Sequence, residues 1–236
     1  METKCGADLA TTVPGRFDEA RRELRGLTAG IEKKALLWLA ARTPAWITPD
    51  HLTVLGLLAM LLAGLAYWVS AERPFWLHVV NVGLVLNWLG DSLDGTLARF
   101  RQRSRPRYGF YVDHLVDAFG ALFLLGGLAL SGYMSERIAL ALLIGYFLVS
   151  INIYLATYTL GVFKISVGPV GGTELRILLA LGNLALLAQP RIGLLGREVL
   201  LYDVVGSAAV AALAVVLVVS TARNTRALHA LERVSG

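Results

Sequence analysis

The sequence predicts an all-α fold: a polytopic membrane protein with six transmembrane helices, preceded by an amphipathic helix at the membrane surface. Of its 236 residues, 56% are hydrophobic and 17% are charged, which leaves too little polar surface for an ordinary soluble domain. Apolar runs of about 20 residues recur along the chain, each long enough to cross roughly 30 Å of hydrocarbon as a helix. These runs lack the period-two alternation of barrel strands, so helices are the expected way to satisfy their backbone hydrogen bonds.

The apolar runs also define the domain organisation. Residues 1–47 are expected to form a cytoplasmic tail and a juxtamembrane helix, because charges alternate with Leu, Ile and Trp at helical spacing over 16–42. A short soluble helix is the alternative for that segment. A six-helix transmembrane domain is expected over 48–222, and a cytoplasmic tail over 223–236. The six expected spans fall near 51–71, 75–99, 108–132, 136–161, 173–189 and 198–221.

The distribution of Lys and Arg predicts the orientation in the membrane. Basic residues concentrate before the first span, in the loop 100–107 and in the C-terminal tail, whereas the loops near 71–74 and 131–137 carry few. Both termini and the 100–107 loop are therefore expected to be cytoplasmic, as in a bacterial inner membrane, although Arg191 and Arg197 lie in a loop expected outside. The net charge of +5 suits anionic lipid, and with no evident soluble domain nucleic acid is not an expected partner.

Four carboxylates lie within these apolar segments at helical spacing. Asp91 and Asp94 are expected near the cytoplasmic end of the second span, and Asp113 and Asp117 just inside the cytoplasmic start of the third. Residues three or four apart share a helix face, so each pair presents two carboxylates together and the two pairs can face each other. A carboxylate in hydrocarbon is costly unless it is paired, hydrated or metal-bound, so the array predicts an active site.

The acids are expected to bind two divalent cations, Mg²⁺ or Mn²⁺. Clustered carboxylates repel one another, and at neutral pH cations relieve that repulsion better than protonation does. Hard ions prefer oxygen ligands and share them with substrate phosphates, whereas a carboxylate site without Cys or a His cluster suits zinc poorly. Two ions that share bridging carboxylates favour displacement at phosphorus.

Small residues follow the acids on the second span. Gly95 and Ala98 continue the face of Asp91 and Asp94, which leaves a shallow slot, and Arg99 could bind phosphate oxygens in bidentate fashion. Close helix packing is the alternative for Gly95, since small residues let membrane helices approach. The loop arginines could also bind phosphate, or could simply mark the cytoplasmic side: Arg101, Arg103, Arg105 and Arg107.

These acids and small residues together form a longer pattern. Asp91-x-x-Asp94-Gly95-x-x-Ala98-Arg99, followed by Gly109-x-x-x-Asp113-x-x-x-Asp117, resembles the signature of the CDP-alcohol phosphotransferase family, integral membrane enzymes of phospholipid synthesis. Eight fixed positions agree in identity and order. Nine residues separate Arg99 from Gly109, one more than is common in the family, and the extra residue falls in the Arg- and Pro-containing loop. The six-span layout and the surface helix resemble the family too.

The resemblance implies a reaction and roles for these residues. A CDP-linked alcohol would bind with its pyrophosphate on two metal ions, and an acceptor hydroxyl would attack the β-phosphorus and release CMP. Asp91, Asp94 and Asp113 would be metal ligands, while Asp117 would border the metals and act as general base. The nucleotide-binding residues would be Thr53, Asp94, Gly95, Ala98, Arg99 and Gly109.

The start of the first span also resembles the family. The segment from Thr48 to Thr53 is similar to its P-N-x-x-T pattern, with Asp50 where Asn is usual. Thr53 could therefore reach the nucleotide from a neighbouring helix. Helix capping by Thr48 or Asp50 is the competing interpretation, since both are favoured N-cap residues.

The residues that select the acceptor are less regular. A polar stripe, which includes Tyr146 and Ser150, recurs every four residues on the fourth span and ends near the acids. Interhelical hydrogen bonding and an interfacial aromatic belt are its alternative interpretation. Thr173 is expected to cap the fifth span. The weaker candidates for acceptor or phosphate contact are Arg105, Arg107, His114, Asn152, Tyr154, Tyr158 and Arg176.

Two combinations of donor and acceptor are open. The short chain resembles members that use CDP-diacylglycerol as donor and a small polar alcohol as acceptor, which is the favoured combination. The Asp113-His114-x-x-Asp117 segment resembles the D-H-x-x-D form of the choline and ethanolamine phosphotransferases, whose acceptor is diacylglycerol. An ion-coupled transporter or an inactive scaffold would not need the intact acids together with Gly95 and Arg99 in fixed relation. The resemblance also implies a homodimer in contact with membrane lipid.

Overall fold

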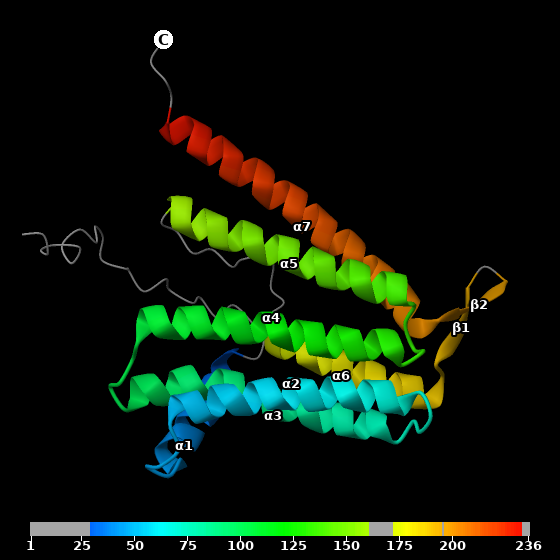
Figure 1. Ribbon diagram of the computed structural model, residues 1–236, viewed down its shortest axis with the longest axis horizontal. Coiled ribbons are helices and arrows are strands. Elements are labelled where there is room, and N and C mark those ends of the chain that lie inside the picture. The colour runs from blue at the N-terminus through cyan, green and yellow to red at the C-terminus, as the bar shows by residue number, and fades with distance from the viewer. Residues whose placement is uncertain (1–28, 161–171, 195, 233–236) are drawn as a thin grey trace, which may run out of the picture.

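The computed structural model describes residues 29–160, 172–194 and 196–232 (Figure 1). The first part of the expected surface helix, and residues 161–171 before α6, lie outside the described residues. The described part of the chain forms seven helices and one hairpin: α1 (Ala29–Arg42), α2 (Pro49–Ser70), α3 (Trp76–Phe100), α4 (Pro106–Leu130), α5 (Glu136–Leu160), α6 (Gly172–Ala188), β1 (Arg191–Leu194), β2 (Arg197–Leu200) and α7 (Leu201–Leu231).

The fold is almost entirely helical, as predicted, and α2 to α7 occupy the six apolar runs. Two features differ from the expectation. The stretch expected as a plain loop between the last two spans forms an antiparallel hairpin, in which Arg191 pairs with Leu200 and Leu194 with Arg197. Gly196, with a φ of 78°, supplies the left-handed backbone conformation that this tight turn requires. In addition, α7 continues to Leu231, beyond the expected end of its span.

Four helices are long and apolar enough to cross a membrane: α2, α4, α5 and α7. Helix α3 carries Asp91, Asp94 and Arg99 in its last turns, and α6 has only 17 residues, about 26 Å at 1.5 Å per residue. The four long helices support an integral membrane protein. Six spans, with α3 and α6 included, stay a prediction.

The helices form two groups. Helix α2 packs against both α3 and α4, and α6 packs against α3, whereas α5 pairs with α7 and meets the rest through α4 (Figure 1). The α2–α4 crossing is close because Gly64 and Gly127 face each other there. A methyl group added to either glycine would overlap the backbone of the other helix.

A buried polar network connects the first group of helices to α7. Tyr67 of α2 and Tyr202 of α7 both donate to Oδ1 of Asn183 on α6, at 2.6 and 2.8 Å. The amide nitrogen of Asn183 donates to Oδ1 of Asn81 on α3 at 2.7 Å. Because Asn183 is fully buried, these bonds satisfy an amide that would otherwise be costly to bury in an apolar core.

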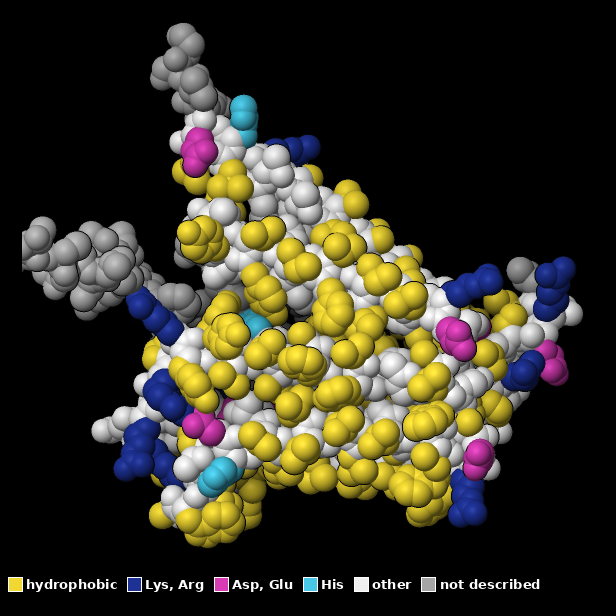
Figure 2. All heavy atoms as spheres, viewed as in Figure 1, with side chains coloured by type: hydrophobic (Ala, Val, Ile, Leu, Met, Phe, Trp, Pro, Cys, Tyr) yellow, Lys and Arg dark blue, Asp and Glu magenta, His cyan; other side chains and the backbone are white. Residues whose placement is uncertain are grey.

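The surface separates into an apolar band and two charged ends. Figure 2 shows hydrophobic side chains over the middle of the helices, with Lys, Arg, Asp and Glu gathered toward either end. The start of α2, the α3–α4 loop and the end of α5 lie together at one end, opposite the hairpin (Figure 1). This arrangement matches helices that cross a membrane with their polar ends in water.

Helix α1 packs across the loop end of the bundle. Leu36 and Ala40 contact a cluster that includes Leu52 of α2 and Leu93 and Leu97 of α3. The other face of α1 exposes apolar side chains, with Leu37 and Trp38 prominent among them. Its position at the membrane surface stays a prediction.

Candidate active site

The four acids of the motif line one small pocket between α2, α3 and α4. Its volume of about 10 Å³ is around the space that a single water molecule needs. Helix α2 contributes a hydroxyl and a glycine, α3 two acids and an amide, and α4 two acids and a valine. The lining residues are Thr53, Gly56, Asn87, Asp91, Asp94, Asp113, Val116 and Asp117.

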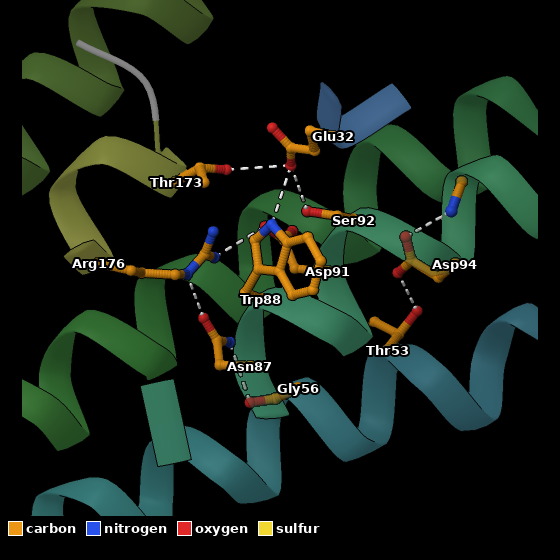
Figure 3. A network of polar contacts seen from close by, with 11 residues as sticks. Glu32, Thr53, Gly56, Asn87, Trp88, Asp91, Ser92, Asp94, Thr173 and Arg176 are labelled. Atoms are coloured by element: carbon orange, nitrogen blue, oxygen red, sulfur yellow. Dashed lines mark hydrogen bonds and ion pairs between the residues drawn. The ribbon is translucent and has the colours of Figure 1, made fainter. Parts of the chain in front are cut away.

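Asp94 is the most buried of the four acids, at 6% exposed. Thr53 Oγ1 on α2 donates to its Oδ2 at 2.7 Å, and the backbone N–H of Gly95 donates to its Oδ1 at 2.5 Å (Figure 3). Both carboxylate oxygens are therefore oriented by donors. Thr53, predicted to reach the nucleotide, makes a direct hydrogen bond to Asp94 in this structure, and its nucleotide contact stays a prediction.

Asp91 is paired with an arginine from a distant part of the chain. Arg176 Nη2 on α6 lies 2.8 Å from Asp91 Oδ2, and its Nε donates to Asn87 Oδ1 at 2.8 Å (Figure 3). The amide nitrogen of Asn87 in turn donates to the carbonyl of Gly56 at 3.1 Å. This chain of contacts connects α2, α3 and α6 and fixes the guanidinium beside the pocket.

The two acids of α4, Asp113 and Asp117, complete the acid lining of the pocket. Asp113 is half-buried and Asp117 is exposed, and Tyr146 and Tyr154 of α5 are within electrostatic range of Asp117. His114 is directed to α5, since its ring centroid lies 4.9 Å from that of Tyr154. The histidine is therefore placed next to the acids in sequence but does not line the pocket.

The small residues of the motif are open rather than packed against a neighbouring helix. A Cβ built on Gly95 would have three atoms of Arg99 as its nearest neighbours, the closest being Nη1 at 3.3 Å. A Cβ on Gly109 would meet nothing within 4 Å. Close helix contact instead uses Gly90, whose Cβ would lie 2.5 Å from the Leu52 carbonyl oxygen. The packing interpretation of Gly95 is therefore wrong in this structure.

The loop arginines make contacts within the protein. Arg101 donates to three carbonyl oxygens of the α1–α2 linker, at Thr43, Pro44 and Ile47. Arg105 reaches both carboxylate oxygens of Asp50, at 2.6 and 2.7 Å. This hydrogen bonding raises the pKa of Arg105 above its ordinary value, so its positive charge is retained.

Two further predictions concern the ends of this region. Thr48 caps α2 as predicted: its hydroxyl accepts from the backbone N–H of His51 at 3.3 Å. Arg107 is exposed at the start of α4, and Ala98 is half-buried on α3. Neither lines the pocket.

Two of the weaker acceptor candidates are not brought to the pocket. Asn152 donates to Ser220 Oγ at 2.7 Å, which ties α5 to α7. The Tyr158 side chain is 89% exposed. Both residues lie on α5, and neither lines the pocket.

Gly56 and Val116, which line the pocket, were not predicted from the sequence, and neither was Glu32 on α1. Glu32 Oε1 on α1 accepts hydrogen bonds from Trp88 Nε1 at 2.9 Å, Ser92 Oγ at 3.3 Å and Thr173 Oγ1 at 3.0 Å (Figure 3). Thr173 was expected to cap α6, but it lies inside that helix and donates to Glu32. The sequence did contain one signal for the position of Glu32. It precedes Leu36 by four residues, so the two side chains share the packed face of α1.

The donor chemistry of the pocket fits hard cations. Its acids supply carboxylate oxygens, and Thr53 adds a hydroxyl, a set that suits Mg²⁺ or Mn²⁺. Within the described ranges, no three His, Cys, Asp or Glu side chains are grouped closely enough to hold an ion. Arg176 and Thr53 instead engage carboxylate oxygens of Asp91 and Asp94. Two bound cations therefore stay a prediction.

Comparison with known proteins agrees with the motif. The model of the CDP-alcohol phosphatidyltransferase family matches residues 46–220, which include all the residues that line the pocket. This chain belongs to the CDP-alcohol phosphatidyltransferase family. The resemblance drawn from the sequence is thereby confirmed, as is its assignment to a family of phospholipid-synthesis transferases.

Several named proteins are similar in sequence to part of this chain. Cholinephosphotransferase 1 of Gallus gallus is 28% identical over 149 residues, 59% of this chain and 43% of the relative. That of Bos taurus is 30% identical over 61% of this chain and 37% of the relative. Archaetidylinositol phosphate synthase of Pyrococcus horikoshii is 32% identical over 44% of this chain and 52% of the relative. The chain thus spans about half or less of the relatives that it matches.

Proposed function

We propose that this chain transfers a substituted phosphate from a CDP-alcohol to an acceptor hydroxyl and releases CMP. The observation that supports this function is the meeting of the four motif acids in one pocket with Thr53. All of these residues fall within the segment that matches the CDP-alcohol phosphatidyltransferase family. An array of acids at a membrane boundary is otherwise difficult to explain.

The acids of the pocket divide into two roles. Asp91, Asp94 and Asp113 would bind two divalent cations, Mg²⁺ or Mn²⁺, with Asp117 at their border. The cations would neutralise pyrophosphate charge and stabilise the leaving group. The Thr53 hydroxyl and the Gly95 N–H donate to opposite oxygens of Asp94, which fixes the plane of that carboxylate before substrate arrives.

Asp117 would act as the general base. It takes the proton of the acceptor hydroxyl as the hydroxyl oxygen attacks the β-phosphorus. The bond between that oxygen and phosphorus forms, the bond from phosphorus to the CMP oxygen breaks, and CMP leaves. The open surface beside Gly95, Ala98 and Gly109 would accept the nucleotide, with Arg99 available to its phosphates.

CDP-diacylglycerol with a small polar acceptor is the favoured substrate pair. The observation behind it is Arg176, a partly buried cation 2.8 Å from Asp91. A guanidinium at that position suits an acceptor that carries phosphate, because Arg can bind phosphate oxygens in bidentate fashion. The relative named archaetidylinositol phosphate synthase agrees with such an acceptor.

A second substrate pair has its own support. His114 gives the motif its D-H-x-x-D form, and several relatives are named cholinephosphotransferase 1. In this alternative, CDP-choline or CDP-ethanolamine is the donor and diacylglycerol the acceptor.

The decisive experiment measures CMP release by the purified full chain in liposomes with Mg²⁺ or Mn²⁺. One arm supplies CDP-diacylglycerol with serine, glycerol 3-phosphate, inositol, inositol phosphate or choline; the other supplies CDP-choline or CDP-ethanolamine with diacylglycerol. Asp117→Asn should abolish CMP release. Glu198→Gln, which also replaces a carboxylate by an amide but lies on the distant hairpin, should leave CMP release intact. The absence of CMP from every donor, or full activity of Asp117→Asn, would refute the proposal.

The same proposal includes orientation and assembly. The pocket end would face the cytoplasm with both termini, and two copies would form a homodimer. Protease accessibility of the 100–107 loop in sealed vesicles tests the first statement. Cross-linking and native mass measurement in lipid nanodiscs test the second.

A further inference from the structure

Glu32 of α1 is connected to the two helices that form the Asp91–Arg176 pair. Its single oxygen Oε1 accepts from Trp88 and Ser92 of α3 and from Thr173 of α6. A carboxylate accepts several hydrogen bonds at once and donates none when ionised, so it suits a point where three donors converge.

Each donor lies next to a residue of the site. Ser92 follows Asp91 directly, Trp88 follows Asn87 directly, and Thr173 precedes Arg176 by three residues on the first turn of α6. The three donors to Glu32 therefore lie on the same helix turns that bring Arg176 to Asp91 and Asn87 (Figure 3). The start of α6 is thus held at two residues: Thr173 contacts α1, and Arg176 makes two contacts to α3.

The packing of α1 supports a fixed position for Glu32. Leu36 and Ala40 follow it at intervals of four residues, and both are buried against α3. Lys33 and Lys34, by contrast, are exposed. The acid is thus on the packed face of α1, not among its solvated charges.

We propose that Glu32 is a positioning residue: it sets the first turn of α6 against α3 and so fixes where Arg176 meets Asp91. Helix α1 thereby becomes part of the support of the active site. The contribution to turnover rests on the proposed phosphotransfer, whereas the contribution to the α6–α3 arrangement does not.

The test compares Glu32→Gln with Glu32→Ala in the purified full chain in nanodiscs. The glutamine keeps a carbonyl oxygen for the three donors, and the alanine removes the acceptor. Backbone hydrogen exchange over 172–178 is the readout that needs no substrate: it should be several-fold faster in Glu32→Ala and near wild type in Glu32→Gln. Lys34→Ala, an exposed change on the same helix, should leave exchange unaltered.

Turnover supplies the second readout. The kcat for CMP release should fall about tenfold or more in Glu32→Ala, the range seen when supporting contacts of a site are lost, and recover in Glu32→Gln. Thr173→Val repeats the test from α6 without disturbing α1, and it should also speed exchange over 172–178. Unchanged exchange in both Glu32→Ala and Thr173→Val would overturn the proposal. Equal losses in Glu32→Gln and Glu32→Ala would overturn it too, because charge rather than hydrogen-bond geometry would then be responsible.

If no donor yields CMP, the proposed function fails, but the exchange comparison still decides the role of Glu32.

Discussion

Arg176 and Asp91, 85 positions apart in the chain, form an ion pair with 2.8 Å between Nη2 and Oδ2. Their side chains are 18% and 24% exposed, so the pair is only partly shielded from solvent. Asp91 is also one of the proposed cation ligands. Arg176 and a bound cation therefore compete for the same carboxylate, and this competition can be measured.

Arg176→Gln is expected to strengthen Mn²⁺ binding, because it removes a positive charge that neutralises a ligand. The same change should raise the KM for an acceptor that carries phosphate. Mn²⁺ titration by electron paramagnetic resonance measures the first effect without turnover. Arg105→Gln, which removes an exposed arginine paired with Asp50, is the control and should leave Mn²⁺ affinity nearly unchanged. Weaker Mn²⁺ binding by Arg176→Gln would contradict the competition.

Thr53→Val should reduce both stability and CMP release, because Asp94 loses a donor in a site where it is 6% exposed. The expected cost is about 1–3 kcal/mol, as for a buried group left short of a partner. Thr53→Ser keeps the hydroxyl and should retain most of the activity. Thermal unfolding in detergent and initial rates of CMP release measure the two effects. A fully active Thr53→Val would show that this hydrogen bond is dispensable.

Gly109→Ala should separate stability from activity. The added methyl group meets nothing within 4 Å in the protein, and alanine favours a helix by about 1 kcal/mol over glycine. The melting temperature should therefore stay the same or rise, while CMP release falls because the methyl group obstructs the nucleotide. Gly126→Ala on the same helix is the matched control: its methyl group also meets nothing within 4 Å, but it is remote from the acids. Equal activity of the two variants would argue against a nucleotide at Gly109.

Tyr67→Phe should lower stability without changing turnover by the folded enzyme. It removes one of two hydroxyl donors to Asn183 in the buried network. Interhelical hydrogen bonds in membrane proteins contribute about 0.6 kcal/mol on average and up to about 1.7. Tyr111→Phe, at an exposed position, is the control for stability. The midpoint of thermal unfolding, combined with kcat measured well below it, tests both statements.

Asp50→Asn should lower the KM for the CDP-linked donor. It weakens the contact in which Arg105 Nη2 donates to both carboxylate oxygens of Asp50 at the start of α2, and it removes a negative charge near the incoming pyrophosphate. The effect should shrink as salt is raised, because the groups are exposed and their interactions are screened. If Asp50→Asn had the same KM for the donor as the unchanged protein at both low and high salt, this pair would not influence donor binding.

Much of the fold could be predicted from the sequence because hydrophobicity is a local signal. The helix that carries Asp91 was expected over 75–99 and is found at Trp76–Phe100, and the other spans began within a few residues of the observed helices. The nearness of Asp113 and Asp117 to the first pair of acids followed from helical spacing and a shared membrane depth. The hairpin of β1 and β2 was missed because four-residue strands carry too little periodicity.

The contacts of the site were harder to predict because they join distant segments. Glu32 stands beside two lysines, so its sequence context resembles a solvated helix face, and only the fold reveals its three donors. Arg101 was interpreted as a topology signal or a phosphate contact, but its guanidinium donates hydrogen bonds to three backbone carbonyls of the α1–α2 linker. Neither pairing has a local pattern from which it could be inferred.

The crossing of Gly64 and Gly127 has a mechanical consequence for the pocket. With no room for even a methyl group between the two backbones, α2 and α4 cannot come closer together there. Thr53 and Asp117 lie about three turns from this point on the same two helices. If the pocket widens while this contact is kept, α2 and α4 rotate about the crossing point, and a small change of crossing angle becomes a larger displacement at the acids.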